Sequence, residues 1–380
     1  MNVLFISNDP RILIATSDVR SRMQAYAKEI ESQGGSLHVL SRAEQTAKIV
    51  EGALTLYGVR VSRWRRIPVL LKQARHIIHE GKIDVVSAQD PFEHGLIAVR
   101  AVRGTNARLH IQVHTDFLSP WFVRAGIFRS PRVAMPILNR LRIRIADYVL
   151  PKASGIRVVS ERVKESMVIR YGARICTPQV LPVTVTTEMP PAVPLPEHPF
   201  TFSLLLVSRL EPEKRIEDVL MAIKRLEAGY PSLGLIIVGE GRERKLLERM
   251  SASLGLSKKV IFAGQRSDVR GLMQSAQGFI QASAYEGYGV TLIEAALSGV
   301  PIITTDVGIV GEVFVGYEHV LSAPVGDPTN LAAHIAWLIE DPQARKVLAQ
   351  SAKARALEHL ENLHNSPKDI VDNIQKTLSV

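Results

Sequence analysis

Glu286-Gly-Tyr-Gly-Val-Thr-Leu-Ile-Glu294 separates two carboxylates by seven residues and runs directly into Ala295-Ala-Leu-Ser-Gly-Val-Pro301. The apolar run before it predicts a strand that ends near Ser283, and the pattern after it predicts a helix from about Gly289. Glycines at 287 and 289 let the backbone turn sharply and approach a bound group closely. The stretch is therefore a strand-to-helix junction of an α/β fold.

This junction is suited to binding a sugar nucleotide. A helix N-terminus presents unpaired N–H groups and partial positive charge, so it can hold a diphosphate while Glu286 and Glu294 bind neighbouring hydroxyls. The simpler alternative is a surface loop in which Glu286 caps the helix and Glu294 is solvated. The two glycines, the apolar helix and the Gly-Val-Pro strand entry favour the ligand site.

Short apolar runs alternate with amphipathic stretches along the whole chain. The predicted strands are 3–7, 36–41, 83–89, 109–114 and 156–160, then 202–208, 233–238, 260–263, 278–281, 301–305 and 319–322. The predicted helices are 18–32, 67–80, 91–102 and 161–170, then 213–227, 241–254, 289–298, 328–339 and 343–361. This alternation predicts parallel sheets covered on both faces.

A proline-rich segment, Met189-Pro-Pro-Ala-Val-Pro-Leu-Pro-Glu-His-Pro199, divides the chain. Prolines at this density continue neither a helix nor a central strand, so residues 184–199 are predicted to be an extended connector. We expect domains at 1–183 and 200–364, with a last helix at about 365–380 that packs back on the first domain. Two doubly wound domains facing across a cleft would bind ligands at the carboxyl ends of their strands.

Composition sets the class of protein. The 380 residues are 46% apolar, which is enough for two cores. The single cysteine, Cys176, excludes an intramolecular disulfide and fits a reducing cytosol. The chain enters its first strand without a leader, and no apolar run reaches about 18 residues, so we expect a cytoplasmic protein that does not span a membrane. Oligomeric state is not indicated.

Positive charge is concentrated in the first half, where residues 1–190 carry 28 Lys and Arg against 15 Asp and Glu. Residues 117–144 contain no acid and mix aromatic residues with arginines: Phe117, Trp121, Phe122 and Phe128 with Arg124, Arg129, Arg132, Arg140, Arg142 and Arg144. A second basic aromatic patch consists of Trp64 with Arg63, Arg65 and Arg66. Such segments bind anionic membrane surfaces at about 1 kcal/mol per cation, or they are surface helices with solvated arginines. No nucleic-acid motif accompanies them, so no nucleic-acid partner is expected.

Two cations follow the strand at 202–208, in Leu204-Leu-Leu-Val-Ser-Arg209-Leu-Glu-Pro-Glu-Lys214. Arg209 can bind two oxygens of a diphosphate, and Lys214 can act on it as a point charge. An ordinary solvated helix start is the alternative, since Lys and Arg are mostly exposed.

These motifs together resemble the signature of the family 4 (group 1) retaining glycosyltransferases of the GT-B fold. The features that match are the Glu286 and Glu294 pair, the Arg209 and Lys214 pair, and the turn Val238-Gly-Glu-Gly241. A tight strand-to-helix connection would explain that turn equally well. The resemblance covers residues 200–315 most strongly, and it implies a GT-B architecture of two Rossmann-like domains.

The resemblance also implies roles for individual residues. Arg209 and Lys214 would hold the donor diphosphate, Glu294 the ribose, and Glu286 would face the donor sugar or diphosphate. The nucleobase would lie against the backbone near residues 265 and 266. The implied donor-binding residues are Arg209, Lys214, Gln265, Arg266, Glu286, Tyr288, Gly289, Val290 and Glu294.

The acceptor side is expected in the first domain. In many family members a histidine after the corresponding strand approaches the donor sugar, and His114 matches it. The loop from Ser7 to Arg22 lacks the glycines that many members carry there, so its side chains would bind the acceptor instead. The acceptor-side candidates are Asn8, Arg20, Arg22, Asp90, Glu93 and His94, with helix capping as the alternative for Asp90 and Glu93.

We therefore expect a metal-independent, retaining glycosyltransferase that moves a hexosyl group from a nucleoside-diphosphate sugar to a hydroxyl acceptor. The expected catalytic residues are Glu286, His114, Arg209 and Lys214, and the two cations would stabilise the leaving diphosphate. No Asp-x-Asp pair predicts a metal, and no cofactor is expected beyond the donor, whose base, UDP or GDP type, stays open. The acceptor is a lipid-linked or cell-envelope glycan, a polysaccharide or a metabolite. An epimerase, a phosphorylase or a non-catalytic sugar-nucleotide binder are the alternatives.

Overall fold

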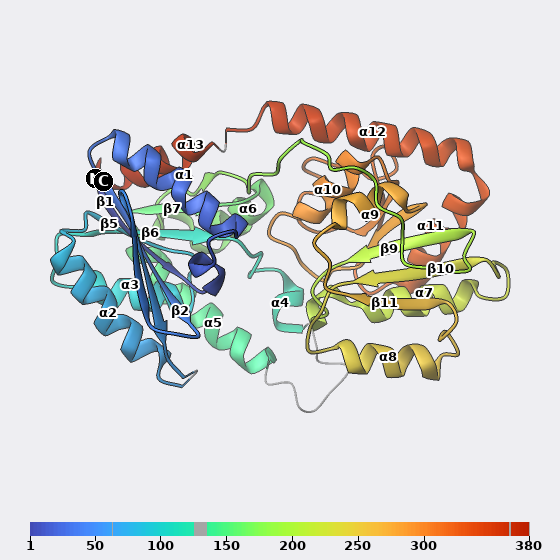
Figure 1. Ribbon diagram of the computed structural model, residues 1–380, viewed down its shortest axis with the longest axis horizontal. Coiled ribbons are helices and arrows are strands. Elements are labelled where there is room, and N and C mark those ends of the chain that lie inside the picture. The colour runs from blue at the N-terminus through green and yellow to red at the C-terminus, as the bar shows by residue number, and fades with distance from the viewer. Residues whose placement is uncertain (63, 125–134, 365, 380) are drawn as a thin grey trace. The chain divides into compact units, whose positions relative to one another are not determined.

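The computed structural model describes residues 1–62, 64–124, 135–364 and 366–379 (Figure 1). It divides into two compact units. Met1–Leu118, Ile137–Thr184 and His364–Val380 form the first unit, and Ser119–Pro136 and Val185–Leu363 form the second. Each unit is built on a largely parallel sheet with helices packed on it, which confirms the predicted α/β class.

The first unit contains an eight-stranded sheet of order β3-β4-β2-β1-β5-β6-β7-β8. Neighbouring strands run parallel except for the β3–β4 hairpin at the edge. The strands are β1 (Asn2–Ser7), β2 (Ser36–Ala43), β3 (Ala47–Glu51), β4 (Leu54–Arg60), β5 (Val85–Ala88), β6 (Arg108–Val113), β7 (Gly155–Val158) and β8 (Gln179–Val180).

Helices of the first unit cover this sheet, and side chains define where several of them begin. They are α1 (Asp18–Ser32), α2 (Arg66–Glu80), α3 (Glu93–Val102), α5 (Met135–Val149), α6 (Glu161–Tyr171) and α13 (Pro367–Lys376). Ser17 caps α1 and Ser160 caps α6, each by accepting a hydrogen bond from a first-turn amide. Ser366 and Asp369 form a capping box at the start of α13, which packs against α1.

The second unit contains a six-stranded sheet of order β11-β10-β9-β12-β13-β14, in which all neighbours run parallel. Its strands are β9 (Phe202–Val207), β10 (Leu233–Val238), β11 (Val260–Gly264), β12 (Gly278–Gln281), β13 (Ile302–Thr305) and β14 (Leu321–Ala323). Its helices are α4 (Pro120–Arg124), α7 (Ile216–Leu226), α8 (Arg244–Ser253), α9 (Val269–Ser275), α10 (Val290–Ser298), α11 (Pro328–Glu340) and α12 (Pro342–Glu361).

Continuous apolar runs explain why the central strands are buried on both faces. In β10 all six residues are buried, and in β1 the residues from Val3 to Ser7 are buried. Close backbone approach explains two glycines of the second unit. Gly239 has φ 138°, and a Cβ there would lie 1.9 Å from the Ser208 carbonyl oxygen, while a Cβ on Gly241 would lie 2.3 Å from that of Leu210.

Strand order reverses once in each sheet, and this fixes where ligands can bind. The chain leaves β1 for β2 on one side, and β5 lies on the other side. In the second unit the same reversal occurs between β9 and β12. Loops diverge at such points beyond the carboxyl ends of the strands, which leaves room for a ligand.

The structure adds elements that the sequence did not predict. The β3–β4 hairpin was missed because the residues of β3 are only partly buried, which weakens the apolar pattern of an edge strand. Helices α4, α5 and α9 were also missed. Of the described residues, 119–124 cluster with the second unit.

Candidate active site

A partly buried ion pair lies at the reversal point of the second sheet. Lys214 follows β9 and Glu286 follows β12, and the Lys214 Nζ is 2.5 Å from the Glu286 Oε1. The Ser283 hydroxyl donates to the same oxygen at 2.7 Å. Both charged side chains are only 15% exposed. The structure thus brings together a cation and a carboxylate that the sequence separates by 72 residues.

The two loops of this pair are joined through the backbone as well. The amide of Ala284 donates to the carbonyl oxygen of Glu213 at 2.7 Å. Arg209 leaves the same edge but its side chain is 72% exposed, with a single ion pair to Glu213 at 3.1 Å. Arg209 is therefore available to a ligand, whereas Lys214 must exchange Glu286 for it.

Helix α10 begins beside this pair without a side-chain cap. Gly289 is its N-cap residue and has φ 105°, a conformation that glycine adopts readily. The preceding loop is held in place because the Ile309 amide donates to the Tyr288 carbonyl oxygen at 2.9 Å. Glu286 binds Lys214 and Ser283, so the alternative in which Glu286 caps this helix is wrong. The Leu292 amide donates to the Gly289 carbonyl oxygen at 2.9 Å, and among the described residues the amides of Val290 and Thr291 are left to a ligand.

Glu294 lies on α10 and lines a cavity of about 430 Å³ with Val207, Arg270 and Gly271. The connector forms another part of its wall through Pro190, Pro191 and Val193. Burial raises the pKa of Glu294, and the charge of Arg270 partly opposes that shift. This half-buried carboxylate is poised to accept hydrogen bonds from hydroxyl groups in the cavity.

Three buried side-chain polar atoms have no hydrogen-bond partner among the described residues, and all lie in the second unit. They are the Ser208 Oγ, the Gln281 Nε2 and the Arg270 Nε. Ser208 follows β9 and Gln281 ends β12, at the reversal point, and Arg270 lines the cavity of Glu294. Leaving such atoms unpaired costs about 1–3 kcal/mol each, so a polar ligand is the natural partner.

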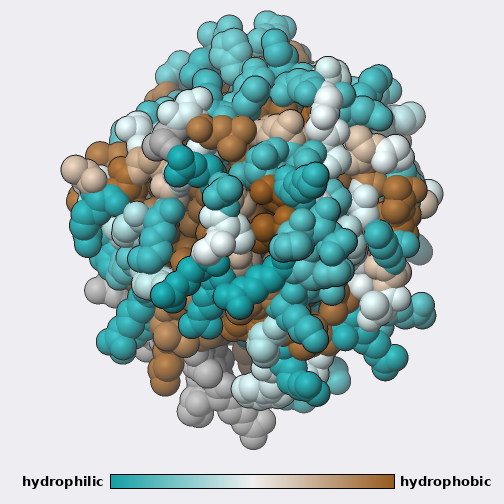
Figure 2. All heavy atoms as spheres, turned by 90° about the vertical axis from the view of Figure 1, so that its left-hand side faces the viewer, coloured by the Kyte–Doolittle hydropathy of each residue, from teal (hydrophilic) through white to brown (hydrophobic). Residues whose placement is uncertain are grey.

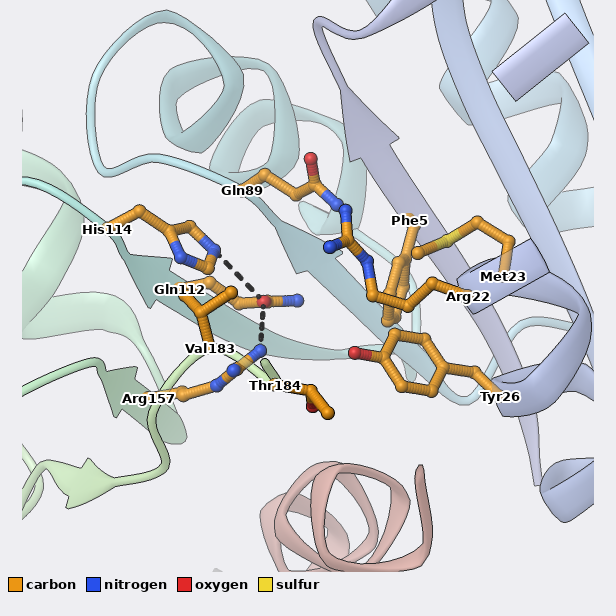
Figure 3. A pocket seen from close by; sticks show the side chains of 10 residues that line it. All are labelled: Phe5, Arg22, Met23, Tyr26, Gln89, Gln112, His114, Arg157, Val183 and Thr184. Atoms are coloured by element: carbon orange, nitrogen blue, oxygen red, sulfur yellow. Dashed lines mark hydrogen bonds between the residues drawn. The ribbon is translucent and has the colours of Figure 1, made fainter. Parts of the chain in front are cut away.

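A second cavity, of about 260 Å³, lies at the reversal point of the first sheet (Figure 3). Gln112 of β6 and Arg157 of β7 are register partners, so both side chains reach it from one face of the sheet. The Arg157 Nη1 donates to the Gln112 Oε1 at 3.0 Å. Arg22 and Tyr26 reach the same cavity from α1, as Figure 3 shows.

His114 follows β6 and lines this cavity. Its Nε2 is 3.3 Å from the Gln112 Oε1. Enclosure by the protein, and then the positive charges of Arg157 and Arg22, lower the pKa of His114 to about 3. His114 is an exposed residue at the edge of the open cavity, and because its pKa is lowered the imidazole is neutral at pH 7.

Two family models match the chain. The model described as "Glycosyl transferases group 1" matches residues 194–355, and "Glycosyltransferase Family 4" matches residues 20–188. The chain belongs to the group 1, family 4 glycosyltransferases. Each unit of the glycosyltransferase thus carries one of the two matches, and the candidate sites described above lie within or beside them.

Curated relatives match the glycosyltransferase over part of its length. Glycogen synthase of Mycobacterium tuberculosis is 30% identical over 154 residues, which are 40% of this chain and 37% of that protein. N-acetyl-alpha-D-glucosaminyl L-malate synthase of Bacillus anthracis is 26% identical over 159 residues, 42% of each chain. The matched region therefore spans about two fifths of these relatives.

Solved structures show that the fold is GT-B. Sucrose-phosphate synthase from Thermosynechococcus elongatus has a TM-score of 0.80 at 17% identity, covering 100% of this chain and 99% of that one. Anabaena HepE, in complex with UDP and glucose, has a TM-score of 0.71 at 20% identity over 100% and 99% of the two chains. At these identities the likeness concerns the fold.

The remaining donor-side candidates lie apart from the Glu294 cavity. Gln265 is exposed, and the Arg266 guanidinium pairs with Asp268 at 2.5 Å. Neither residue lines the cavity, although Ser267 and Asp268 do. The sequence also missed Gln281 and Arg270. A glutamine at the end of the apolar run Gly278–Gln281 was the available signal, because uncharged polar residues are uncommon in buried parallel strands.

Of the acceptor-side candidates, Arg22 lines the first-unit cavity and the others do not. Arg20 is buried and pairs with Glu51, because two positions along a helix point its side chain away from Arg22. Asn8 is exposed. Asp90 accepts from the amides of Phe92 and His94 and from the His94 ring, as in the capping alternative.

These contacts determine the ionisation state of Asp90. Burial opposes the charge of Asp90, but His94 and the two backbone amides outweigh it and lower the pKa of Asp90. Glu93 is buried between two arginines, with Arg66 at 2.9 Å and Arg142 at 3.1 Å. Glu93 therefore has structural partners already in place.

The structure corrects part of the prediction that residues 117–144 contact a membrane surface. Phe117 and Phe122 are buried, and Arg142 is paired with Glu93, so these three side chains are not available to a membrane surface. Arg140 and Arg144 are exposed on α5, and Trp64 is 93% exposed. Arg63, Phe128, Arg129, Arg132 and the side chain of Arg124 lie outside the described residues.

The surface and the metal-ligating groups give two further observations. Figure 2 shows one face of the molecule, on which hydrophilic residues predominate and apolar residues form small groups. Within the described ranges, every helix is too short or too polar to cross a bilayer. Within the same ranges, His, Cys, Asp and Glu side chains do not gather in threes as metal ligands would.

Proposed function

We propose that the chain is a metal-independent, retaining glycosyltransferase that moves a hexosyl group from a nucleoside-diphosphate sugar to a hydroxyl acceptor. The observation that supports this most directly is the Lys214, Glu286 and Ser283 cluster beside the uncapped start of α10. The lysine and the helix N-terminus can bind a negatively charged diphosphate, and the carboxylate can accept hydrogen bonds from the hydroxyl groups of the attached sugar.

The chemistry required of these groups is stabilisation of a leaving diphosphate. As the bond from the anomeric carbon to the phosphate oxygen breaks, negative charge grows on that oxygen. Lys214 and the first-turn amides of α10 would meet this charge in a site of low exposure, where fixed charges act strongly. Arg209 would add a fork of donors from the exposed side. These cations would take the role that a divalent ion plays elsewhere.

Retention of configuration fits a front-face reaction. In such a step the acceptor hydroxyl attacks from the side of the departing diphosphate, and a phosphate oxygen takes its proton. Glu286 would face the donor sugar, because its carboxylate stands between Lys214 and Ser283. His114, neutral at pH 7, would donate to or accept from a sugar hydroxyl on the first unit.

The nucleoside would occupy the cavity of Glu294. Its carboxylate would accept from the ribose hydroxyls, and the unpaired Arg270 Nε would find a polar partner there. The solved structure of Anabaena HepE with UDP and glucose supports UDP as the first donor nucleotide to test.

A screen without divalent metal tests the proposal. We expect one of UDP, GDP or ADP to raise the melting temperature, and its sugar conjugate to yield a transferred product when acceptors are supplied. Arg209→Ala should lose most turnover, whereas Arg225→Ala, which removes an exposed arginine of α7, should not. Release of an epimerised sugar nucleotide would indicate an epimerase instead of a transferase. Nucleotide binding without any product would indicate a non-catalytic binding protein.

We also propose a cytoplasmic location with contact to anionic lipid through the exposed Arg140 and Arg144. Removing both should reduce sedimentation with anionic vesicles, at about 1 kcal/mol per cation. Removing the exposed Arg103 and Arg108 serves as the matched control. Equal sedimentation of the two double variants would discard the lipid contact.

A further inference from the structure

The first-unit cavity is positively charged and lacks acids. The ten described residues that line it include Arg22, Arg157 and His114 but no Asp or Glu. Two acids lie close enough for their charge to be felt, and both are already paired: Asp9 with Arg11, and Asp90 with His94.

Arg157 forms part of the cavity wall and has no acidic partner among the described residues. It is buried, and its contacts with described residues are all to neutral oxygens: the carbonyls of Leu181 and Pro182, both at 2.9 Å, the Gln112 Oε1 and the Tyr26 hydroxyl. Burial lowers the pKa of Arg157. A guanidinium has five N–H groups, so one remains after these four contacts. A buried charge without a counter-charge is costly, which calls for an anion from outside.

A chain of buried hydrogen bonds holds this arginine in position. The Gln112 Nε2 donates to the Ser87 Oγ at 3.0 Å, Ser87 lies 2.8 Å from the His110 Nδ1, and the His110 Nε2 lies 2.9 Å from the Asn373 Oδ1. The Asn373 Nδ2 donates to Gln179 at 2.7 Å. Helix α13 is thus connected to the cavity through the sheet.

The directions of these bonds follow from which atoms can donate. The Asn373 Oδ1 only accepts, so the His110 Nε2 carries the proton. Burial lowers the pKa of His110 to about 4, so its Nδ1 is unprotonated and accepts from Ser87. The Gln112 amide nitrogen is committed to Ser87, which leaves the Gln112 Oε1 to accept from Arg157 and from the His114 Nε2. The His114 Nε2–H is therefore donated to Gln112, the His114 Nδ1 is left as an acceptor, and the arginines supply the positively charged donors of the cavity.

We propose that this cavity binds an oxyanion group, a phosphate or a carboxylate, of the acceptor substrate. The inference rests on the proposed function, because it assigns the substrate class of the acceptor side. Arg157 would supply a fixed positive charge and its remaining N–H group, and Arg22, which is half-buried on α1, would approach from the opposite wall near Gln89 (Figure 3). A cavity of about 260 Å³ has room for the anionic group and part of the molecule that carries it.

Titration calorimetry with small anions tests this. Inorganic phosphate, glucose 6-phosphate, glucuronate and neutral glucose would be titrated into the intact protein with UDP present to occupy the donor site. The variants are Arg22→Gln and Arg157→Lys, and Arg108→Gln is the control, because it removes one exposed arginine at the opposite end of β6. Loss of one charge-assisted contact corresponds to roughly 10- to 100-fold weaker binding.

The expected result is that phosphate or glucuronate binds the wild type and Arg108→Gln within about twofold, and binds Arg22→Gln at least about 10-fold more weakly. Binding of phosphate would indicate an acceptor that carries a phosphate, and binding of glucuronate would indicate an acceptor that carries a carboxylate. Failure of both anions to bind the wild type, or an equal loss in Arg108→Gln, would overturn the inference. The UDP-induced rise in melting temperature, measured on the same samples, reports the proposed function separately. If Arg157→Lys fails to fold, Arg22→Gln decides.

Discussion

Replacing Lys214 by alanine should separate stability from nucleotide binding in a way that only a diphosphate ligand explains. The Lys214 Nζ and the Glu286 Oε1 are 2.5 Å apart, and each side chain is 15% exposed. Removing one partner of a fully buried pair costs about 3–5 kcal/mol, and exposed pairs contribute about 0.2–1 kcal/mol. This pair lies between those limits, so Lys214→Ala should cost about 2 kcal/mol, or about 4–8 °C in melting temperature.

The loss of nucleotide binding has a different origin. Lys214→Ala removes a charge-assisted contact to the diphosphate, worth about 1.5–3 kcal/mol, so the Kd for UDP should rise roughly 10- to 150-fold. Glu286→Gln weakens the pair but keeps the lysine, so UDP should bind it as tightly as the wild type or more tightly. The double variant should recover part of the stability, because no unpaired carboxylate remains, but none of the UDP affinity.

Calorimetric titration with UDP and a thermal melt of the four proteins measure both quantities. Lys224→Ala is the control, because Lys224 forms a pair of the same length with Glu227 on the more exposed face of α7. It should change neither stability nor affinity by much. Wild-type affinity in Lys214→Ala, or recovery of affinity in the double variant, would refute the assignment of Lys214 to the diphosphate.

Three further predictions concern other parts of the molecule. Glu294→Ala should weaken UDP binding about 10-fold and leave pyrophosphate binding unchanged in titrations; equal losses for both would contradict a ribose contact. Burial lowers the pKa of His110 to about 4, so the unfolded chain binds a proton that the folded chain does not as pH falls from about 6.5 to 4. The free energy of unfolding should therefore fall by up to about 3 kcal/mol over this window, and the same slope in His110→Gln would exclude the cause. Gly239→Ala should cost roughly 2–4 kcal/mol in denaturant titrations, because its Cβ would meet the Ser208 carbonyl, whereas Gly229→Ala, with nothing within 4 Å, should be close to neutral.

Periodicity was sufficient to predict most of the fold. The helix at 18–32 and the strands at 233–238 and 278–281 match the structure to the residue, because each is a strong apolar pattern with a clear boundary. Edge elements were missed for the converse reason. The half-exposed β3 gives no strong alternation, and α9 is only seven residues long.

Site residues were predictable mainly where a sequence motif contains them, as for Glu294 on α10. Lys214 and Glu286 belong to such motifs, and the structure brings them into contact. Arg157, Gln112 and Gln281 lie inside apolar strands, where register across the sheet decides which cavity they reach. A single polar residue within a buried run was the signal, but its partner strand cannot be identified from one sequence.

The Lys214 ion pair of the second unit and the cavity of the first unit differ in how their charges are balanced, and this difference separates their roles. In the second unit the cation Lys214 is neutralised by Glu286 until a ligand arrives, so binding must exchange one anion for another. In the first unit Arg157 has only neutral partners, so an incoming anion replaces nothing and gains the whole interaction. A diphosphate must leave after each turnover, which favours a site with a competing internal carboxylate. An acceptor must be held while its hydroxyl reacts, which favours a fixed and uncompensated charge. The preference for an anionic acceptor therefore follows from the absence of a carboxylate partner for Arg157 among the described residues.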